Sequence, residues 1–512
     1  MGFKTIIITI FITPVVLSLA ACGGSNSNAV TSSGQSGTGD ASSIDMSCDN
    51  AVFPSAEWTQ CEAQNFARTT EAPAEVMAPE FQQRFVAQGL FNQAEWTQRS
   101  VDDASWLSPM SGNTVVLPLC TTWNLQCAGD PFRYLGVDGP DGQSFYDNEA
   151  EVIPVVFYDQ ACARISGRVW RPRTGSGPFP GVVIQNGSVQ APETLYWWAA
   201  QALVRSGYLV MTFDPRGQGR SDQQTPAGEQ GSNANPVVFW EGLVNAIDFF
   251  RSTSAQPYPH NQTCANTYPT TVTAFNPFTS NLDFGRLGIA GHSLGGTGVS
   301  VVQSYGATGA DAWPGLIDAT NPVDAVVAWD GIFTQESGGS GNAGGNAPGT
   351  TSGSTSTPPV VAQFPILGQN SEYGLTPIPF SSPPDPEQLI TNFGVWQDAG
   401  IPVIEQTIQG SSHYEWSLLP TFPATSWCPN PASEECEGGW GNDFAEHYML
   451  AWFDRWLKQS GEPGFATADA RLLDDDGVQG RNKYSFRYQS ARDFATRDGQ
   501  RQLCLDIRAG CQ

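Results

Sequence analysis

The chain has 512 residues, 40% of them hydrophobic, which is enough for one large domain with extensions or for two domains. Its 50 acidic and 24 basic residues give a formal net charge of -26. A surface with this charge repels nucleic acid and anionic lipid headgroups, so the composition excludes nucleic acid as an expected partner.

The N-terminus has the pattern of an export signal, predicted over residues 1–21. Lys4 precedes an apolar run that ends in "LAAC", a small-residue cleavage site followed by Cys22. The run is too short for a comfortable membrane span. The segment resembles a bacterial lipoprotein signal. This resemblance implies that Cys22 is acylated and anchors the exported protein in the bacterial cell envelope, at the outer membrane or the cell surface.

Ordinary secretion with cleavage nearby is the alternative for this segment. In either case, residues 22–47 are rich in Ser, Gly and Asn and are predicted to form a flexible linker.

The cysteine count agrees with export. The chain has 11 cysteines, and an odd number is awkward in an oxidising compartment. Assigning Cys22 to a lipid leaves ten, enough for five disulfides. We expect cysteines close in sequence to pair, as Cys48–Cys61, Cys120–Cys127, Cys162–Cys264, Cys428–Cys436 and Cys504–Cys511. No C-x-x-C pair or Cys/His cluster is present, so the sequence predicts no metal site.

Residues 48–150 show no clear alternation of strand and helix patterns, and they are predicted to form an N-terminal extension that wraps the main body. From 151 to 460, short apolar runs alternate with helical patterns. Predicted strands cover 152–158, 163–172, 181–187, 208–214, 284–292, 324–330, 364–369 and 402–410, and predicted helices cover 193–207, 235–253, 293–306 and 443–459. This alternation predicts an α/β fold with a mainly parallel sheet and helices on both faces.

Two insertions interrupt this alternation, at 255–281 and at 337–359, and the second is a low-complexity run of Gly, Ser and Thr. After the last helix, residues 461–512 are predicted to form a C-terminal tail with one strand at 484–490.

The sequence "GHSLG" matches the G-x-S-x-G pattern between a predicted strand and a predicted helix. A nucleophile on such a tight turn needs neighbours without side-chain bulk, and Gly291 and Gly295 flank Ser293 in this way. The turn also places the hydroxyl at a helix N-terminus, which favours negative charge. The pattern therefore predicts Ser293 as a catalytic nucleophile rather than part of a purely structural turn.

A serine nucleophile needs a base, and the chain has four histidines. His413 lies in "QGSSHYEW", just after the last predicted strand, at the same sheet edge as Ser293. His292 adjoins Ser293 and is expected to point away from it. His260 lies in an insertion, and His447 lies on the last predicted helix. We therefore predict His413 as the base.

Three carboxylates are candidates for the acid that orients the base. Glu372 follows the penultimate predicted strand, where the acid is common in this arrangement, and is the first choice. Asp330 ends the strand before it and is the second choice. Asp385 lies in "PPDPEQ", resembles a helix N-cap and ranks last.

An oxyanion formed at Ser293 needs two main-chain N–H donors. We expect one from Leu294, directly after the nucleophile. The other is expected from Ser188, with Val189 as the alternative, because Gly187 before them would let the backbone approach the substrate. Three tryptophans, Trp197, Trp198 and Trp416, either line a pocket for the acyl or alcohol group or pack in the core.

Four segments together resemble the α/β-hydrolase serine esterases and lipases: "GHSLGG", "QNGS", "FDPRGQGRSD" and "GSSHYEW". The resemblance covers about residues 151–460. It implies a nucleophile elbow, an acid and a histidine in this chain order, and no cofactor or metal. Asn186 departs from the pattern, since a histidine often stands at this position before the oxyanion glycine.

The function predicted from these features is an exported serine hydrolase that cleaves carboxylic esters through an acyl-enzyme intermediate. Small-molecule and polymeric esters are both candidate substrates, and the aromatic content favours hydrophobic acyl, aryl or polyester groups. A serine peptidase or acyltransferase on the same fold is one alternative. A non-catalytic surface-binding lipoprotein is the other.

Overall fold

The computed structural model describes most of the chain from residue 145 onward, together with one helix of the extension. The described residues are 48, 51–76, 101–102, 145–188, 192–219, 221–231, 235–265, 272–335, 357–413, 415–416, 441–475 and 483–511. They all belong to one unit, Ile44–Gln512.

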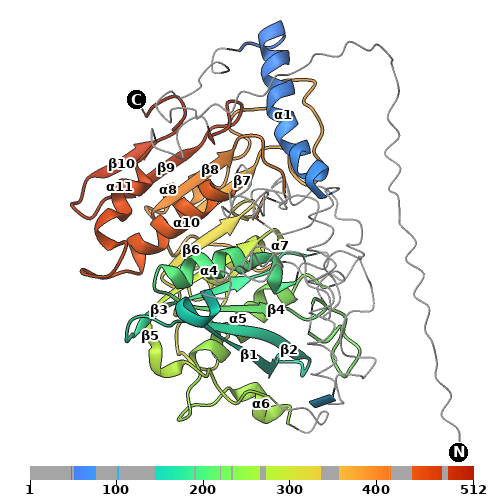
Figure 1. The fold of residues 1–512 in the computed structure, drawn as a ribbon, viewed down its shortest axis with the longest axis vertical. Coiled ribbons are helices and arrows are strands. Elements are labelled where there is room, and N and C mark those ends of the chain that lie inside the picture. The colour runs from blue at the N-terminus through green and yellow to red at the C-terminus, as the bar shows by residue number, and fades with distance from the viewer. Residues whose placement is uncertain are drawn as a thin grey trace, which may run out of the picture. The chain divides into compact units, whose positions relative to one another are not determined.

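The described residues build a ten-stranded sheet with the order β1-β2-β4-β3-β5-β6-β7-β8-β9-β10 (Figure 1). The strands are β1 (Ala150–Tyr158), β2 (Arg164–Pro172), β3 (Phe179–Gln185), β4 (Leu209–Asp214), β5 (Leu282–His292), β6 (Ala325–Trp329), β7 (Ile366–Ser371), β8 (Val403–Ile408), β9 (Ala491–Ala495) and β10 (Arg501–Cys504). The central strands from β4 to β8 pair in parallel. The outer pairs at both edges are antiparallel. The predicted α/β architecture with a mainly parallel sheet is confirmed.

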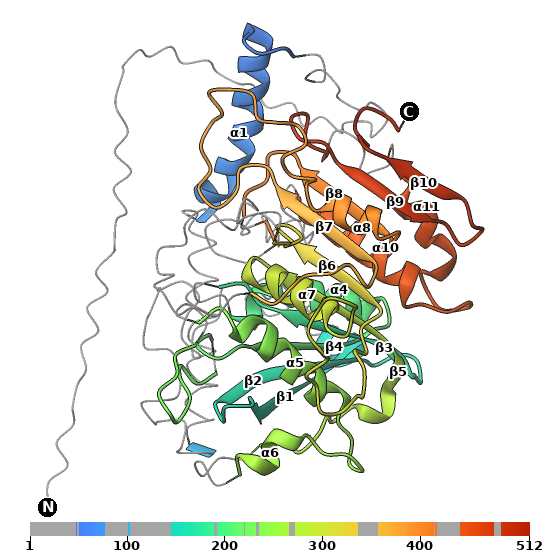
Figure 2. The same ribbon diagram turned by 180° about the vertical axis from the view of Figure 1, so that it is seen from behind.

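Helices cover both faces of this sheet. The α-helices of the described part of the chain are α1 (Ala56–Val76), α4 (Trp197–Arg205), α5 (Val238–Arg251), α6 (Pro259–Thr263), α7 (Leu294–Ser304), α8 (Phe393–Asp398), α10 (Asn442–Trp456) and α11 (Ala468–Leu472). Figure 1 shows α10 in front of the sheet, and Figure 2, seen from behind, shows α7 in front.

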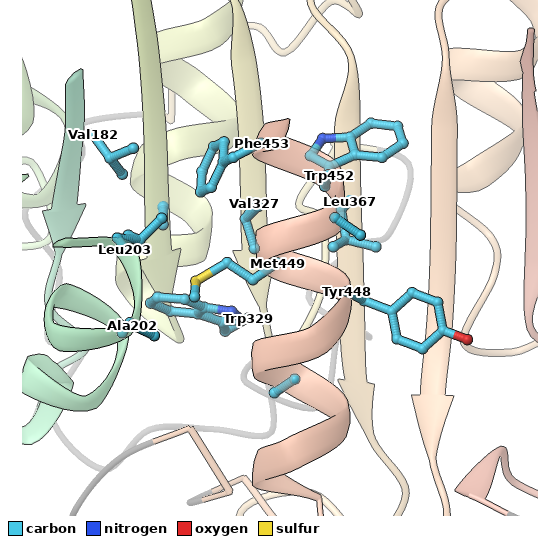
Figure 3. Packing of buried hydrophobic residues seen from close by; sticks show 14 of the residues in the cluster. Val182, Ala202, Leu203, Val327, Trp329, Leu367, Tyr448, Met449, Trp452 and Phe453 are labelled. Carbon is cyan, nitrogen blue, oxygen red and sulfur yellow. The ribbon is translucent and has the colours of Figure 1, made fainter. Parts of the chain in front are cut away.

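Each face of the sheet has its own core, because successive side chains of a strand point to opposite faces. Val182 and Ile184 of β3 pack with α4 and α10, whereas Val183 packs with α5 and α7. Figure 3 shows the first core, in which Met449 and Phe453 of α10 lie against β6. The continuous apolar runs of the central strands reflect burial on both faces.

The tail differs from the prediction. Residues 484–490 form no strand, and the strands of this region are β9 and β10, which extend the main sheet beyond β8. The segment bends because Ser485 Oγ accepts from the main-chain N–H groups of Arg487 and Tyr488, each at 3.0 Å, which forms a local turn in place of strand pairing. Ser485 and Arg487 are buried and bond to Glu372 and Glu62.

Three of the predicted disulfides are confirmed: Cys48–Cys61, Cys162–Cys264 and Cys504–Cys511. The predicted pairs at 120–127 and 428–436 lie outside the described residues, as do Cys22 and nearly all of the 337–359 insertion. Within the part of the chain that the structure describes, none of the helices is both long enough and apolar enough to cross a bilayer.

Candidate active site

Ser293 occupies a strained turn between β5 and α7. It is the single residue between the two elements and has φ 58° and ψ -122°, a left-handed conformation that is unfavourable for a side-chain-bearing residue. A Cβ on Gly291 would lie 2.2 Å from the Gly295 carbonyl oxygen, and one on Gly295 would lie 2.4 Å from the Asn186 carbonyl oxygen. Both glycines are therefore required for this turn. Ser293 is partly exposed, whereas its neighbour His292 is buried.

His413 lies beyond the end of β8, and its Nδ1 pairs with Oδ2 of Asp330. Asp330 directly follows β6, with a positive φ of 61°, and its Oδ1 accepts from Ser371 N at 2.8 Å. Both members of the pair are buried. Burial alone would raise the pKa of Asp330, but the facing His413 and hydrogen bonds from His413 and Ser371 hold it below its usual value.

The strand register brings Asp330 next to Ser293. His292 of β5 is paired with Trp329 of β6, so the residues that follow them leave the sheet side by side. Ser293 N also donates to the Trp329 carbonyl oxygen at 3.1 Å. Serine, aspartate and histidine thus follow three parallel strands at the same sheet edge, the edge at which ligands bind in open α/β sheets.

This strand order, with the serine turn after β5 and the histidine after β8, decides the fold. The chain has an α/β-hydrolase fold. Comparison of the sequence with known protein families gives no match, and a search of curated proteins also gives none. Among solved structures, the chain is similar to a Klebsiella pneumoniae subsp. pneumoniae MGH 78578 protein provisionally described as a dienelactone hydrolase. Identity is 16% and the TM-score is 0.32, over 60% of this chain and 100% of that one.

The prediction that Glu372 is the partner of His413 is wrong, because Asp330 takes that place in this α/β-hydrolase fold. Glu372 lies at the end of β7, and its carboxylate is fully occupied elsewhere. It accepts from Asn65 Nδ2 and Gly410 N, each at 2.5 Å, and from Ser485 Oγ at 2.6 Å. Asp385, the third candidate, is exposed and caps a local turn through Glu387 N.

His292 joins the two loops that flank Ser293, a role that the sequence did not reveal. Its Nε2 lies 2.8 Å from the carbonyl oxygen of His413, which can only accept, so Nε2 carries the proton. Its Nδ1 therefore accepts from the Tyr196 hydroxyl at 2.9 Å. That hydroxyl in turn accepts from Gly187 N at 2.9 Å. Burial lowers the pKa of His292 to about 3, so the ring is neutral.

The loop after β3 lies against the serine turn. A Cβ on Gly187 would be 3.1 Å from His292 Nδ1 and 3.2 Å from the His292 carbonyl oxygen. Ser188 follows directly and is partly exposed. Leu294 is the first residue of α7, and the first N–H groups of a helix lack partners within the helix itself. The predicted oxyanion donors Ser188 and Leu294 thus come from segments in contact, whereas Val189 lies outside the described residues.

The predicted pocket residues Trp197, Trp198 and Trp416 lie in the core, with at most 4% of each exposed. Trp198 Nε1 donates to the Trp416 carbonyl oxygen at 2.9 Å, and Trp416 Nε1 donates to Gln369 Oε1 at 3.1 Å. Trp198 and Trp416 thus connect α4, the segment after His413 and β7, and all three indoles are buried.

The described residues contain no group of three or more His, Cys, Asp or Glu side chains that could hold a metal ion.

Proposed function

We propose that this protein is a serine hydrolase that cleaves carboxylic esters through an acyl-enzyme intermediate. The observation that carries the proposal is the buried pair of Asp330 and His413 beside the strained turn of Ser293. A buried carboxylate on Nδ1 of a histidine, next to a serine at a helix N-terminus, is the arrangement that activates serine for acyl transfer.

In the first half of the proposed cycle, Ser293 Oγ attacks the ester carbonyl carbon while His413 takes the hydroxyl proton. Because Nδ1 faces Asp330, Nε2 is the nitrogen that exchanges this proton. The negative Asp330 stabilises the imidazolium, and the lowered pKa of Asp330 keeps it ionised. When the tetrahedral intermediate collapses, the bond to the alcohol oxygen breaks and His413 returns the proton to the leaving alcohol.

In the second half, His413 removes a proton from water, which attacks the acyl carbon. The bond to Ser293 Oγ breaks, Oγ regains the proton, and the carboxylic acid leaves. The proposed donors to the oxyanion in both halves are the main-chain N–H groups of Leu294 and Ser188. Each such donor typically lowers the barrier by roughly 2.7–4 kcal/mol.

The substrate class rests on the sequence. Hydrophobic acyl, aryl or polyester groups are the proposed substrates, as small molecules or polymers. The site is also compatible in its chemistry with a peptidase or an acyltransferase, and a comparison of matched ester and amide substrates separates these activities.

The proposed location is the bacterial cell envelope, with Cys22 acylated. Export is supported by the three disulfides among the described residues, because such bonds persist in oxidising compartments.

The experiment that tests the proposal is labelling with a fluorophosphonate together with hydrolysis of p-nitrophenyl esters of varied acyl length. We expect the wild-type protein to be labelled at Ser293 and to turn over the esters. Ser293→Ala is expected to lose labelling and at least about 10³-fold in kcat. Labelling that persists in Ser293→Ala, or a wild-type protein inert to every ester, would contradict the proposal.

A further inference from the structure

A buried polar cluster connects the N-terminal helix α1 to the turn that carries His413. We call it the Glu372 cluster, and its members are Glu62, Asn65, Glu372, Tyr373, Ser485 and Arg487. All six are buried. Glu62 and Asn65 come from α1, more than 300 positions away in sequence from the residues that they contact on the main body. Figures 1 and 2 show α1 beside the ends of β7 and β8.

The cluster holds the turn before His413 at several points. Glu372 accepts from Gly410 N at 2.5 Å through the same oxygen that accepts from Asn65. Main-chain hydrogen bonds also connect the two segments, since Tyr373 N donates to the Ser411 carbonyl oxygen at 3.1 Å. His413 N donates to the Gly374 carbonyl oxygen at 2.9 Å. The position of His413 therefore depends on residues 372–374.

The charges of the cluster depend on α1. Arg487 pairs with Glu62 and lies 3.4 Å from Glu372, and its side chain is only 2% exposed. Arg487 also donates to the Tyr373 hydroxyl at 2.6 Å. Removing one partner of a buried ion pair strongly destabilises the folded protein, because it leaves an uncompensated buried charge. Without Glu62 and Asn65, Glu372 and Arg487 would have to rearrange, and the Gly410 contact would be disturbed.

We infer that α1 is a positioning element of the active site, because Glu62 and Asn65 complete the buried site from which Glu372 holds the His413 turn. This inference rests on the proposed function of His413 as the base. It gives the N-terminal extension a role in positioning the proposed catalytic histidine. Glu372, Glu62 and Asn65 act through His413 and touch no substrate.

The test is Asn65→Asp in the full-length protein, which sets a second carboxylate against Glu372. The matched control is Gln64→Glu, which adds the same charge to an exposed position of the same helix. Ester hydrolysis is measured as kcat and KM per active site, with active sites counted by fluorophosphonate titration, and the melting temperature is recorded for each variant.

We expect kcat per titrated site to fall at least about 10-fold in Asn65→Asp with KM changed less than about threefold, because small displacements of a catalytic group are costly. Gln64→Glu is expected to match the wild type. A kcat per site equal to that of Gln64→Glu, with only a lower melting temperature, would show a merely structural role. A raised KM with unchanged kcat would overturn the inference as well.

If Asn65→Asp does not fold, Asn65→Ala and Glu62→Gln are measured in the same way and judged by the same criteria. The two proposals fail separately. A wild-type protein without Ser293-dependent ester hydrolysis refutes the proposed function, whereas an active wild type with an equally active Asn65 variant refutes only the role of α1.

Discussion

Asp330 holds Nδ1 of His413 although strand β7 lies between the strands that carry the two residues. The chain after β8 must therefore cross the end of β7 to bring His413 to Asp330. The hydrogen bonds from residues 372–374 to the Gly410–His413 turn form at this crossing. The end of β7 thus supplies the support for the histidine loop, and the end of β6 supplies the carboxylate that pairs with His413.

Asp330→Asn tests whether Asp330, rather than a residue at the end of β7, is the acid that assists His413. An amide keeps the shape but favours the wrong tautomer of His413 and removes the charge that stabilises the imidazolium. We expect kcat for a p-nitrophenyl ester to fall by about 10³- to 10⁴-fold. Asp385→Asn removes an exposed carboxylate and should stay within twofold of the wild type. A kcat for Asp330→Asn within tenfold of the wild type would show that Asp330 is not the acid that assists His413.

Tyr196→Phe tests the connection between the two loops at Ser293. The change deletes the hydroxyl that accepts from Gly187 N and donates to His292 Nδ1, and it leaves both buried groups without that partner. An unsatisfied buried polar group costs about 1–3 kcal/mol. We expect a lower melting temperature and a kcat reduced about 5- to 50-fold, since a misplaced oxyanion donor costs barrier stabilisation.

Tyr305→Phe, at the C-terminal end of α7, is the matched control for loss of a tyrosine hydroxyl. If Tyr196→Phe and Tyr305→Phe hydrolyse the ester at equal rates, the chain of hydrogen bonds through His292 has no part in catalysis.

Ser293 and His413 could be placed from the sequence because each carries a local signal. The glycines around Ser293 match G-x-S-x-G between a predicted strand and a predicted helix, and His413 follows the last parallel strand. The acid had no such signal. Asp330, Glu372 and Asp385 all follow strands or lie in loops beyond them, and only the path of the chain across β7 decides which one meets the histidine.

Helix α1 was missed for a different physical reason. Its buried face includes Trp58 but also Glu62, Asn65 and Thr69, so the face that packs inward is largely polar. Apolar periodicity finds helices that bury hydrophobic side chains. It does not find a helix whose inward face is matched to a charged cluster formed by residues hundreds of positions away.

Stability at mildly acidic pH should depend on His292. Its pKa is about 3 in the folded protein and about 6.5 in an unfolded chain. Between these values the unfolded state binds a proton that the folded state does not, so stability falls as the pH falls from about 6.5 toward 3. The full loss is on the order of 5 kcal/mol. Asp330 has a lowered pKa and adds its own loss only below about pH 4.

Urea unfolding of the wild type and of His292→Asn between pH 7 and pH 4.5 measures this contribution. His260 and His447 also have pKa values lowered by burial and titrate in both proteins, so the difference between the two curves isolates His292. We expect the free energy of unfolding of His292→Asn to fall less steeply with decreasing pH. Parallel curves would mean that His292 is protonated without cost in the folded protein.

Cys22→Ser tests the proposed anchor. Acylation of Cys22 would hold the wild type in the membrane fraction, because each buried methylene of an acyl chain contributes about 0.8 kcal/mol. We expect the wild type to incorporate labelled palmitate and to partition into a detergent phase. Cys22→Ser should do neither, and it should keep the ester kcat of the wild type because the proposed lipid would be separated from the described unit by the predicted 22–47 linker. Palmitate incorporation by Cys22→Ser would place the lipid on another residue, and a wild type found only in the aqueous phase would favour ordinary secretion.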